Sequence, residues 1–175
     1  MKLSTLISAA LIGLSIPTYA YAVGSGDDSS AAKTATKCEA GEIYDKKLEK
    51  CVVLKSATDD ALYENAMGLA YRGEYQTAID LLSVVKNQDD PRVLNYMGFT
   101  HRKLGMNDEA MDYYARALDI NPDYILARSY MGQGLVSDGD LAGAKAQLTE
   151  ISARGGEGSW AYRMLDNAIT SGMTF

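Results

Sequence analysis

Few residues of this chain are suited to chemistry, and their spacing argues against an enzyme active site. The 175 residues contain one histidine, His101, and two cysteines, Cys38 and Cys51. Because imidazole and thiolate ligands are so scarce, we expect neither a metal nor a cofactor. No serine, cysteine or carboxylate stands where the sequence would make it a triad partner of His101. We therefore expect this histidine to pack between helices.

The two cysteines lie in a short segment with residues that favour strands on both sides of a bend. Ile43 and Tyr44 precede Asp45-Lys46-Lys47, and Cys51-Val52-Val53 follows it. The spacing is far from Cys-x-x-Cys, and no nearby histidine or arginine would activate a thiolate. We expect residues 38–54 to form a β-hairpin closed by a Cys38–Cys51 disulfide. A redox role for the pair is the alternative.

Other groups that resemble catalytic motifs have structural explanations. The pairs Asp59-Asp60 and Asp89-Asp90 precede apolar periodic segments, where carboxylates complement a helix dipole and cap its free amides. The segment Gly155-Gly156-Glu157-Gly158 lacks the Lys-Ser/Thr of a phosphate loop. We therefore expect the chain not to be an enzyme.

The beginning of the chain carries an export signal. Lys2 is followed by an uncharged run from Leu3 to Ile16, and Ala20-Tyr21-Ala22 offers small residues for cleavage. We expect a signal peptide over residues 1–22 and a flexible leader over 23–37, in a periplasmic or secreted protein with no membrane span after cleavage. An uncleaved anchor is the alternative. The formal net charge of -6 argues against a nucleic-acid partner.

From about Thr58 onward the sequence repeats itself. Small and large residues recur in register: Tyr96-Met97-Gly98 as Tyr130-Met131-Gly132, Gly73 and Gly105 as Gly139, and Ala78 and Ala110 as Ala144. The positions of glycine and proline, which end or begin helices, then predict helices over 59–72, 75–86, 91–104, 107–120, 124–137 and 141–153, with a seventh over 159–171. Asp90 before Pro91, and Asn121 before Pro122, are expected to open helices.

Two glycines fall inside predicted helices, where glycine costs about 1 kcal/mol relative to alanine. Gly98 and Gly132 therefore indicate points where two helices approach closely. The alanines at 78, 110 and 144 are the expected complement on the second helix of each pair. Gly73, Gly105 and Gly139 are expected at the turns between helices.

A period near thirty-four residues with paired helices resembles the tetratricopeptide repeat. The middle copy matches best, with Leu94, Met97, Gly98, His101, Gly105, Ala110, Tyr114, Ala117 and Pro122 at signature positions. It departs from the family pattern with Leu94 in place of tryptophan and with His101 and Asn107 in place of aromatic residues. The resemblance implies an all-α, right-handed α-solenoid of three helix pairs, at 58–90, 91–124 and 125–154 within 58–154, plus a capping helix at 159–171. Such a cap covers the apolar face that the last repeat exposes.

The resemblance also implies a concave groove lined by the first helix of each pair. The groove residues that it implies are Tyr63, Met67, Arg92, Asn95, Phe99, Arg102, Arg128, Ser129 and Gln133. We expect these to bind a protein or peptide partner, with an acidic group held by an arginine. The protein would then be a non-catalytic exported adaptor. A self-associating envelope assembly or stress factor, with the groove filled by its own leader or by a neighbour's tail, is the alternative.

Overall fold

A computed structural model describes residues 37–175, and the signal peptide and almost all of the leader expected from the sequence lie outside this range. The described residues form two strands, a short 3-10 turn and seven α-helices. Their bounds are β1 Glu42–Asp45, β2 Lys50–Val53, η1 Leu54–Ser56, α1 Asp59–Tyr71, α2 Tyr75–Ser83, α3 Pro91–Lys103, α4 Asn107–Ile120, α5 Ile125–Ser137, α6 Leu141–Ala153 and α7 Trp160–Ser171.

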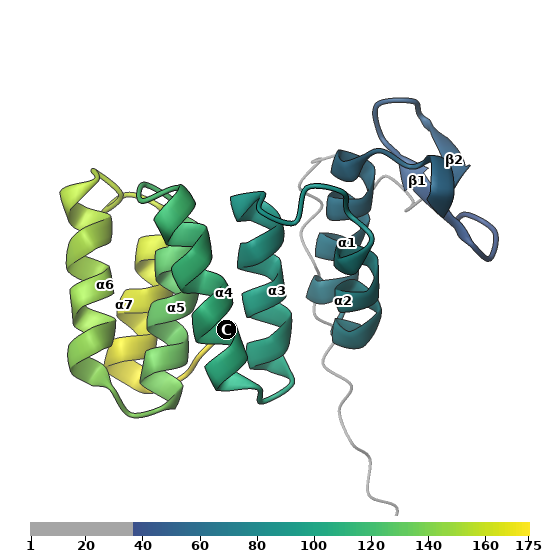
Figure 1. Cartoon of the computed structure of the whole chain (residues 1–175). Coiled ribbons are helices and arrows are strands. Elements are labelled where there is room, and N and C mark those ends of the chain that lie inside the picture. The colour runs from purple at the N-terminus through teal and green to yellow at the C-terminus, as the bar shows by residue number, and fades with distance from the viewer. Residues whose placement is uncertain (1–36) are drawn as a thin grey trace, which may run out of the picture. The chain divides into compact units, whose positions relative to one another are not determined.

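The helices α1 to α6 follow one another along the molecule, and α7 lies beside α5 and α6 (Figure 1). Within residues 37–175 each helix pairs with its successor as α1/α2, α3/α4 and α5/α6, and α7 packs on both α5 and α6. This arrangement is the all-α solenoid with a capping helix that the repeat predicts. The helix bounds agree with the sequence analysis within one residue at most ends, but α2 ends at Ser83, earlier than expected.

Side-chain caps fix the start of several helices. Thr58 accepts a hydrogen bond from the Ala61 N–H, Asp90 from Arg92, and Ser159 from Tyr162. One expectation about helix starts is wrong: Asn121-Pro122 does not open α5, whose N-cap is Tyr124. The Asn121 side chain instead accepts from the Asp123 N–H at 3.2 Å, which makes a turn before the helix.

The glycines inside helices do mark close approaches, although the neighbours are not the expected alanines. A Cβ on Gly98 would lie 2.7 Å from Tyr114 Cε1 on α4, and one on Gly132 would lie 2.6 Å from Leu165 Cδ1 on α7. Gly98 thus makes room for a buried ring, and Gly132 for the capping helix. The turn glycines Gly73, Gly105 and Gly139 all have φ of 82°, where a side chain would be strained.

The two strands form an antiparallel hairpin with Tyr44 opposite Cys51, and the predicted Cys38–Cys51 disulfide is present. The hairpin packs on α1, because the Asn65 side chain donates to the Tyr44 main-chain oxygen at 2.8 Å. Lys46 pairs with Glu64 of α1 at 3.2 Å. The hairpin therefore packs on the first of the described helices.

The apolar core consists of three clusters that together include residues from all seven helices. Its largest fully buried side chains include Tyr96, Tyr114, Tyr130, Leu82 and Leu165. Tyr114 packs against Gly98 and Leu165 packs against Gly132. The repeat glycines therefore leave the space that these two core side chains fill. Within residues 37–175 no helix is long and apolar enough to cross a membrane.

Candidate functional site

The first helices of the pairs, α1, α3 and α5, contact one another in sequence order and form a surface that we call the inner face. The groove residues expected from the sequence are spread over these helices. Six of them are buried and polar or aromatic on α3 and α5, namely Asn95, Phe99, Arg102, Arg128, Ser129 and Gln133. Polar side chains at 0–8% exposure need partners, so their contacts indicate what this face can do.

One end of the inner face is an ion-pair network. Arg92 pairs with Asp90 at 2.6 Å and with Asp60 at 3.0 Å, and its guanidinium lies 4.9 Å from the Tyr63 ring centroid. Lys47 of the hairpin also binds Asp60. The hydrogen bonds from Lys47 and Arg92 lower the pKa of Asp60, and the bond from Arg92 lowers that of Asp90. Because Arg92 already faces two carboxylates, it is poorly suited to hold an acidic ligand.

Tyr63 and Met67 of α1 line the same end of the inner face. Both are half-buried, and the Tyr63 hydroxyl lies 4.0 Å from Met67 Sδ. Burial raises the pKa of Tyr63 to about 12, so its hydroxyl stays protonated at neutral pH. These side chains offer an apolar surface with one hydrogen-bond donor.

Arg128 and Ser129 are used for packing of the third repeat. The Arg128 guanidinium donates to the Pro122 main-chain oxygen at 2.8 Å and to Gln147 of α6 at 3.1 Å. The Ser129 hydroxyl donates to the Ala161 main-chain oxygen on α7 at 2.7 Å. The structure therefore groups Arg128 with α6. Ser129 binds α7 and also accepts a hydrogen bond from Gln133 Nε2 at 3.4 Å.

Arg102 and Gln133 come together at the other end of the inner face and hold a main-chain segment. Arg102 Nη2 donates to the Phe175 main-chain oxygen at 2.6 Å. The Phe175 N–H donates to Gln133 Oε1 at 2.7 Å. Two side chains that are 7% and 0% exposed thus bind both polar main-chain groups of a single residue. The inner face at this point has the chemistry of a peptide-backbone clamp.

An aromatic cluster surrounds this clamp. We define it as Tyr71, Tyr96, Phe99, Tyr130 and Trp160, which come from α1, α3, α5 and α7. Phe99 lies 5.0 Å from Tyr130 and 6.2 Å from Tyr71 between ring centroids. The Tyr71 hydroxyl lies 2.7 Å from that of Tyr96 and 3.3 Å from that of Tyr130.

Burial raises the pKa of Tyr96 and of Tyr130, so both remain neutral donors. Their shared contact with the half-exposed Tyr71 ties α1, α3 and α5 together at the clamp. The aromatic cluster therefore combines an apolar surface with a fixed set of hydroxyl groups, as protein-binding surfaces commonly do.

Asn95 lies on α3 between Arg92 and Phe99 and is completely buried. Neither its Nδ2 nor its Oδ1 has a hydrogen-bond partner among residues 37–175. A buried amide without partners costs about 1–3 kcal/mol.

No other candidate in the described range makes a competing site. His101 Nδ1 lies 2.8 Å from the Met97 main-chain oxygen and the ring packs on Tyr113, as expected for a packing residue. Residues 37–175 contain no group of three or more histidine, cysteine or acidic side chains that could hold a metal ion.

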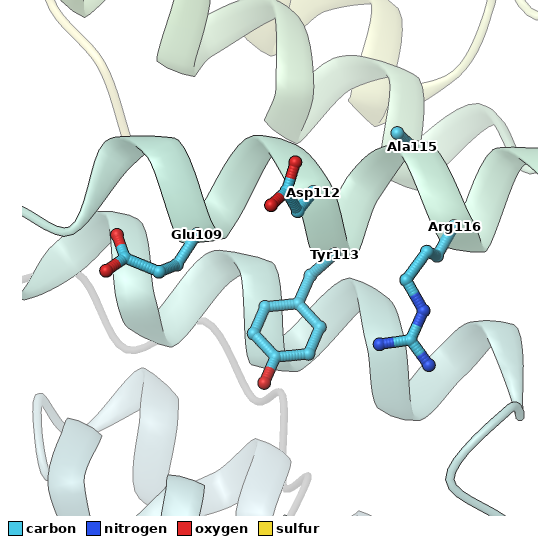
Figure 2. Close-up of a pocket in the computed structure, with 5 residues that line it drawn as sticks. All are labelled: Glu109, Asp112, Tyr113, Ala115 and Arg116. Carbon is cyan, nitrogen blue, oxygen red and sulfur yellow. The ribbon is translucent and has the colours of Figure 1, made fainter.

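Figure 2 shows a hollow on α4, with Tyr113 and Arg116 projecting on the same side of the helix. It is lined by Glu109, Asp112, Tyr113, Ala115 and Arg116. All of these belong to one helix, and Arg116 is already paired with Asp89 at 3.0 Å. We therefore place the candidate site on the inner face, where several helices contribute side chains.

The sequence analysis missed several residues of this site. Tyr71, Trp160 and Phe175 lie outside the groove positions that the resemblance implies, and Tyr96 and Tyr130 were noted only as repeat residues. The recurrence of tyrosine at the same place in α3 and α5 was a usable signal for the hydroxyl contacts. No repeat signal could have indicated Phe175, because it lies beyond the last helix.

Comparison with known proteins supports the fold. Residues 91–124 match the tetratricopeptide repeat family. No curated protein matches the chain. The Sgt2 TPR domain from Aspergillus fumigatus has a TM-score of 0.56 and 26% identity, and the match covers 64% of this chain and 76% of that one.

The type III secretion translocator chaperone SycD from Yersinia enterocolitica is also similar. Its structure with a peptide of the translocator YopD has a TM-score of 0.54 and 19% identity, with 64% of this chain and 86% of that one covered. A second SycD structure has a TM-score of 0.54 and 20% identity, with 67% and 84% covered. Residues 91–124 thus match one tetratricopeptide repeat, and the seven helices of residues 37–175 form an α-solenoid similar to known tetratricopeptide domains.

Proposed function

We propose that this protein is a non-catalytic adaptor that binds an extended segment of a partner protein on its inner face. The observation that carries the proposal is the clamp in which Arg102 and Gln133 bind the main-chain oxygen and N–H of Phe175. A site that recognises main-chain groups can hold extended peptides of many sequences, with side-chain pockets adding selectivity.

The aromatic cluster supplies the selectivity. Its rings come from four helices, so a bound side chain would contact several elements at once. Aromatic residues and arginine are the types most often found at the centre of protein interfaces. The SycD structure with a bound translocator peptide supports the proposal, because it shows that a solenoid of this fold can accommodate a peptide.

We further propose that the adaptor works outside the cytoplasm. The basis is the signal peptide expected over residues 1–22 and the Cys38–Cys51 disulfide, which persists in oxidising compartments. Amino-terminal sequencing of the protein recovered from its own cells tests this part. A chain that begins at Val23 in the exported fraction is expected, and an intact chain retained in the cytoplasm would contradict it.

Site-specific photo-crosslinking tests the binding face. A photoreactive amino acid is placed at Met67, half-buried on the inner face, and at Ala115, exposed on α4, in otherwise unchanged protein in its own cells. Crosslinked partner chains are expected from position 67 and not from the control position 115. Partner capture from 115 alone would move the site to the hollow on α4 and would overturn the proposal.

A further inference from the structure

The C-terminal segment, residues 172–175, folds back onto the inner face of its own chain. Gly172 ends α7 with φ of 74°, a left-handed conformation that turns the chain sharply. The Thr174 hydroxyl then lies 3.4 Å from that of Ser137 on α5, and Phe175 enters the clamp. Figure 1 shows this segment leaving α7 and running back toward the middle of the helix row.

Phe175 contacts all four helices that line the site. Its ring centroid lies 6.2 Å from that of Tyr71 on α1, 6.1 Å from that of Phe99 on α3 and 5.7 Å from that of Trp160 on α7. Its N–H binds Gln133 on α5. A single residue therefore shows both recognition elements of the site, the main-chain clamp and the aromatic cluster.

We propose, on the basis of the peptide-binding function above, that the C-terminal segment is an intrachain occupant of the site, and that the partner is an extended segment whose aromatic side chain replaces that of Phe175. The occupant indicates the ligand class, because the groups that it satisfies must be satisfied again when it leaves. Gln133 is fully buried and Arg102 nearly so, and neither can be left facing apolar surface without cost.

The C-terminal segment makes few contacts with the site, so a partner can displace it. Phe175 is 40% exposed and Met173 is 75% exposed, so the segment holds the site mainly through one ring and one main-chain pair. The connection after α7 is short, which keeps the local concentration of the segment in the millimolar range. A partner must therefore bind better than the segment, and its apparent affinity falls in proportion to the fraction of open sites.

Competition with a synthetic peptide tests this proposal in the full chain. The probe is a fluorescent Thr-Ser-Gly-Met-Thr-Phe peptide with a free carboxyl end, which copies residues 170–175. Wild type is compared with Phe175→Ala, which empties the aromatic cluster, and with Met173→Ala as a matched control on an exposed residue of the same segment. We expect Phe175→Ala to bind the probe about tenfold tighter or more, because its own segment then holds the site through the main-chain pair alone and is displaced more easily, and Met173→Ala to bind it as wild type does.

A probe with alanine in place of phenylalanine should lose binding to the Phe175→Ala protein. Equal probe affinity for wild type and Phe175→Ala, or equal binding of the two probes, would overturn the proposal. If this happens while crosslinking from position 67 persists, the intrachain occupant is disproved and the adaptor function stands. If crosslinking is lost as well, the proposed function itself fails.

The only tryptophan of the chain provides a second readout that needs no ligand. Trp160 lies edge-on to Phe175, so its fluorescence should change in Phe175→Ala, stay as in wild type in Met173→Ala, and be restored when the probe binds. The wild-type signal should not depend on protein concentration. A signal that changes on dilution would show that a second copy of the chain supplies the segment, which would contradict intrachain occupancy.

Discussion

Replacing Gly98 with alanine should destabilise the protein, although alanine is the better helix former. Gly98 lies within α3, where the exchange by itself gains about 1 kcal/mol. The new Cβ would lie 2.7, 2.8 and 3.0 Å from three ring atoms of Tyr114. That ring is completely buried, so it cannot move aside without disturbing the core between α3 and α4.

Overpacking of this kind costs about 1–3 kcal/mol, which exceeds the gain in helix propensity. We therefore expect a net loss of about 1 kcal/mol in the free energy of unfolding. Gly68 is the matched control within α1, where a Cβ would meet only Arg72 Nη1 at 3.4 Å, the end of an exposed and flexible side chain. There alanine should stabilise the protein by up to about 1 kcal/mol.

Urea unfolding followed by far-ultraviolet circular dichroism measures both variants against wild type. The changes in the free energy of unfolding caused by the two substitutions should differ by about 2 kcal/mol and should have opposite signs. A Gly98→Ala protein that is as stable as Gly68→Ala would refute the close approach of α3 to Tyr114. The packing explanation for the repeat glycines would then fall with it.

Two further predictions concern the amino-terminal half of the solenoid. Replacing both Cys38 and Cys51 with alanine should cost about 3 kcal/mol of hairpin stability, because the disulfide closes a short loop that two strands alone hold weakly. Hydrogen exchange should show faster exchange in β1 and β2 with little change in α5 to α7, and uniform loss over all helices would contradict a local role. Asp90→Asn keeps a good N-cap acceptor but removes the charge that binds Arg92, so it isolates the ion pair. The pKa of Asp90 is lowered by Arg92, so its contribution to stability is present above the unfolded pKa near 4 and is lost as the pH falls through the lower folded value. The variant should be modestly less stable than wild type at neutral pH and equal to it in acid, and an unchanged difference at all pH values in urea unfolding would count against this explanation.

The repeated part of the fold could be predicted because its signals are local. Glycines at helix turns, caps such as Asp90 and the apolar period set each helix within a few residues of chain. The regular recurrence of Gly98 and Gly132 also indicated where helices approach. The side chains that pack against these glycines, Tyr114 and Leu165, could not be assigned from the sequence. Each neighbouring helix carries several large side chains, and the sequence does not show which of them points toward the glycine.

The sequence by itself determined the order and pairing of the helices, most of their bounds, and the disulfide at their amino-terminal side. It also placed Phe99, Arg102 and Gln133 on the helices that line the inner face. The reason is that helix formation and stacking of neighbouring repeats depend on contacts between residues close in the chain. Only the tertiary structure decided which of these residues act together. The clamp joins Arg102 and Gln133 to Phe175, and the last of these is separated from the others by the whole of α6 and α7. Contacts at such sequence separation depend on the final position of every intervening helix, which no local pattern encodes.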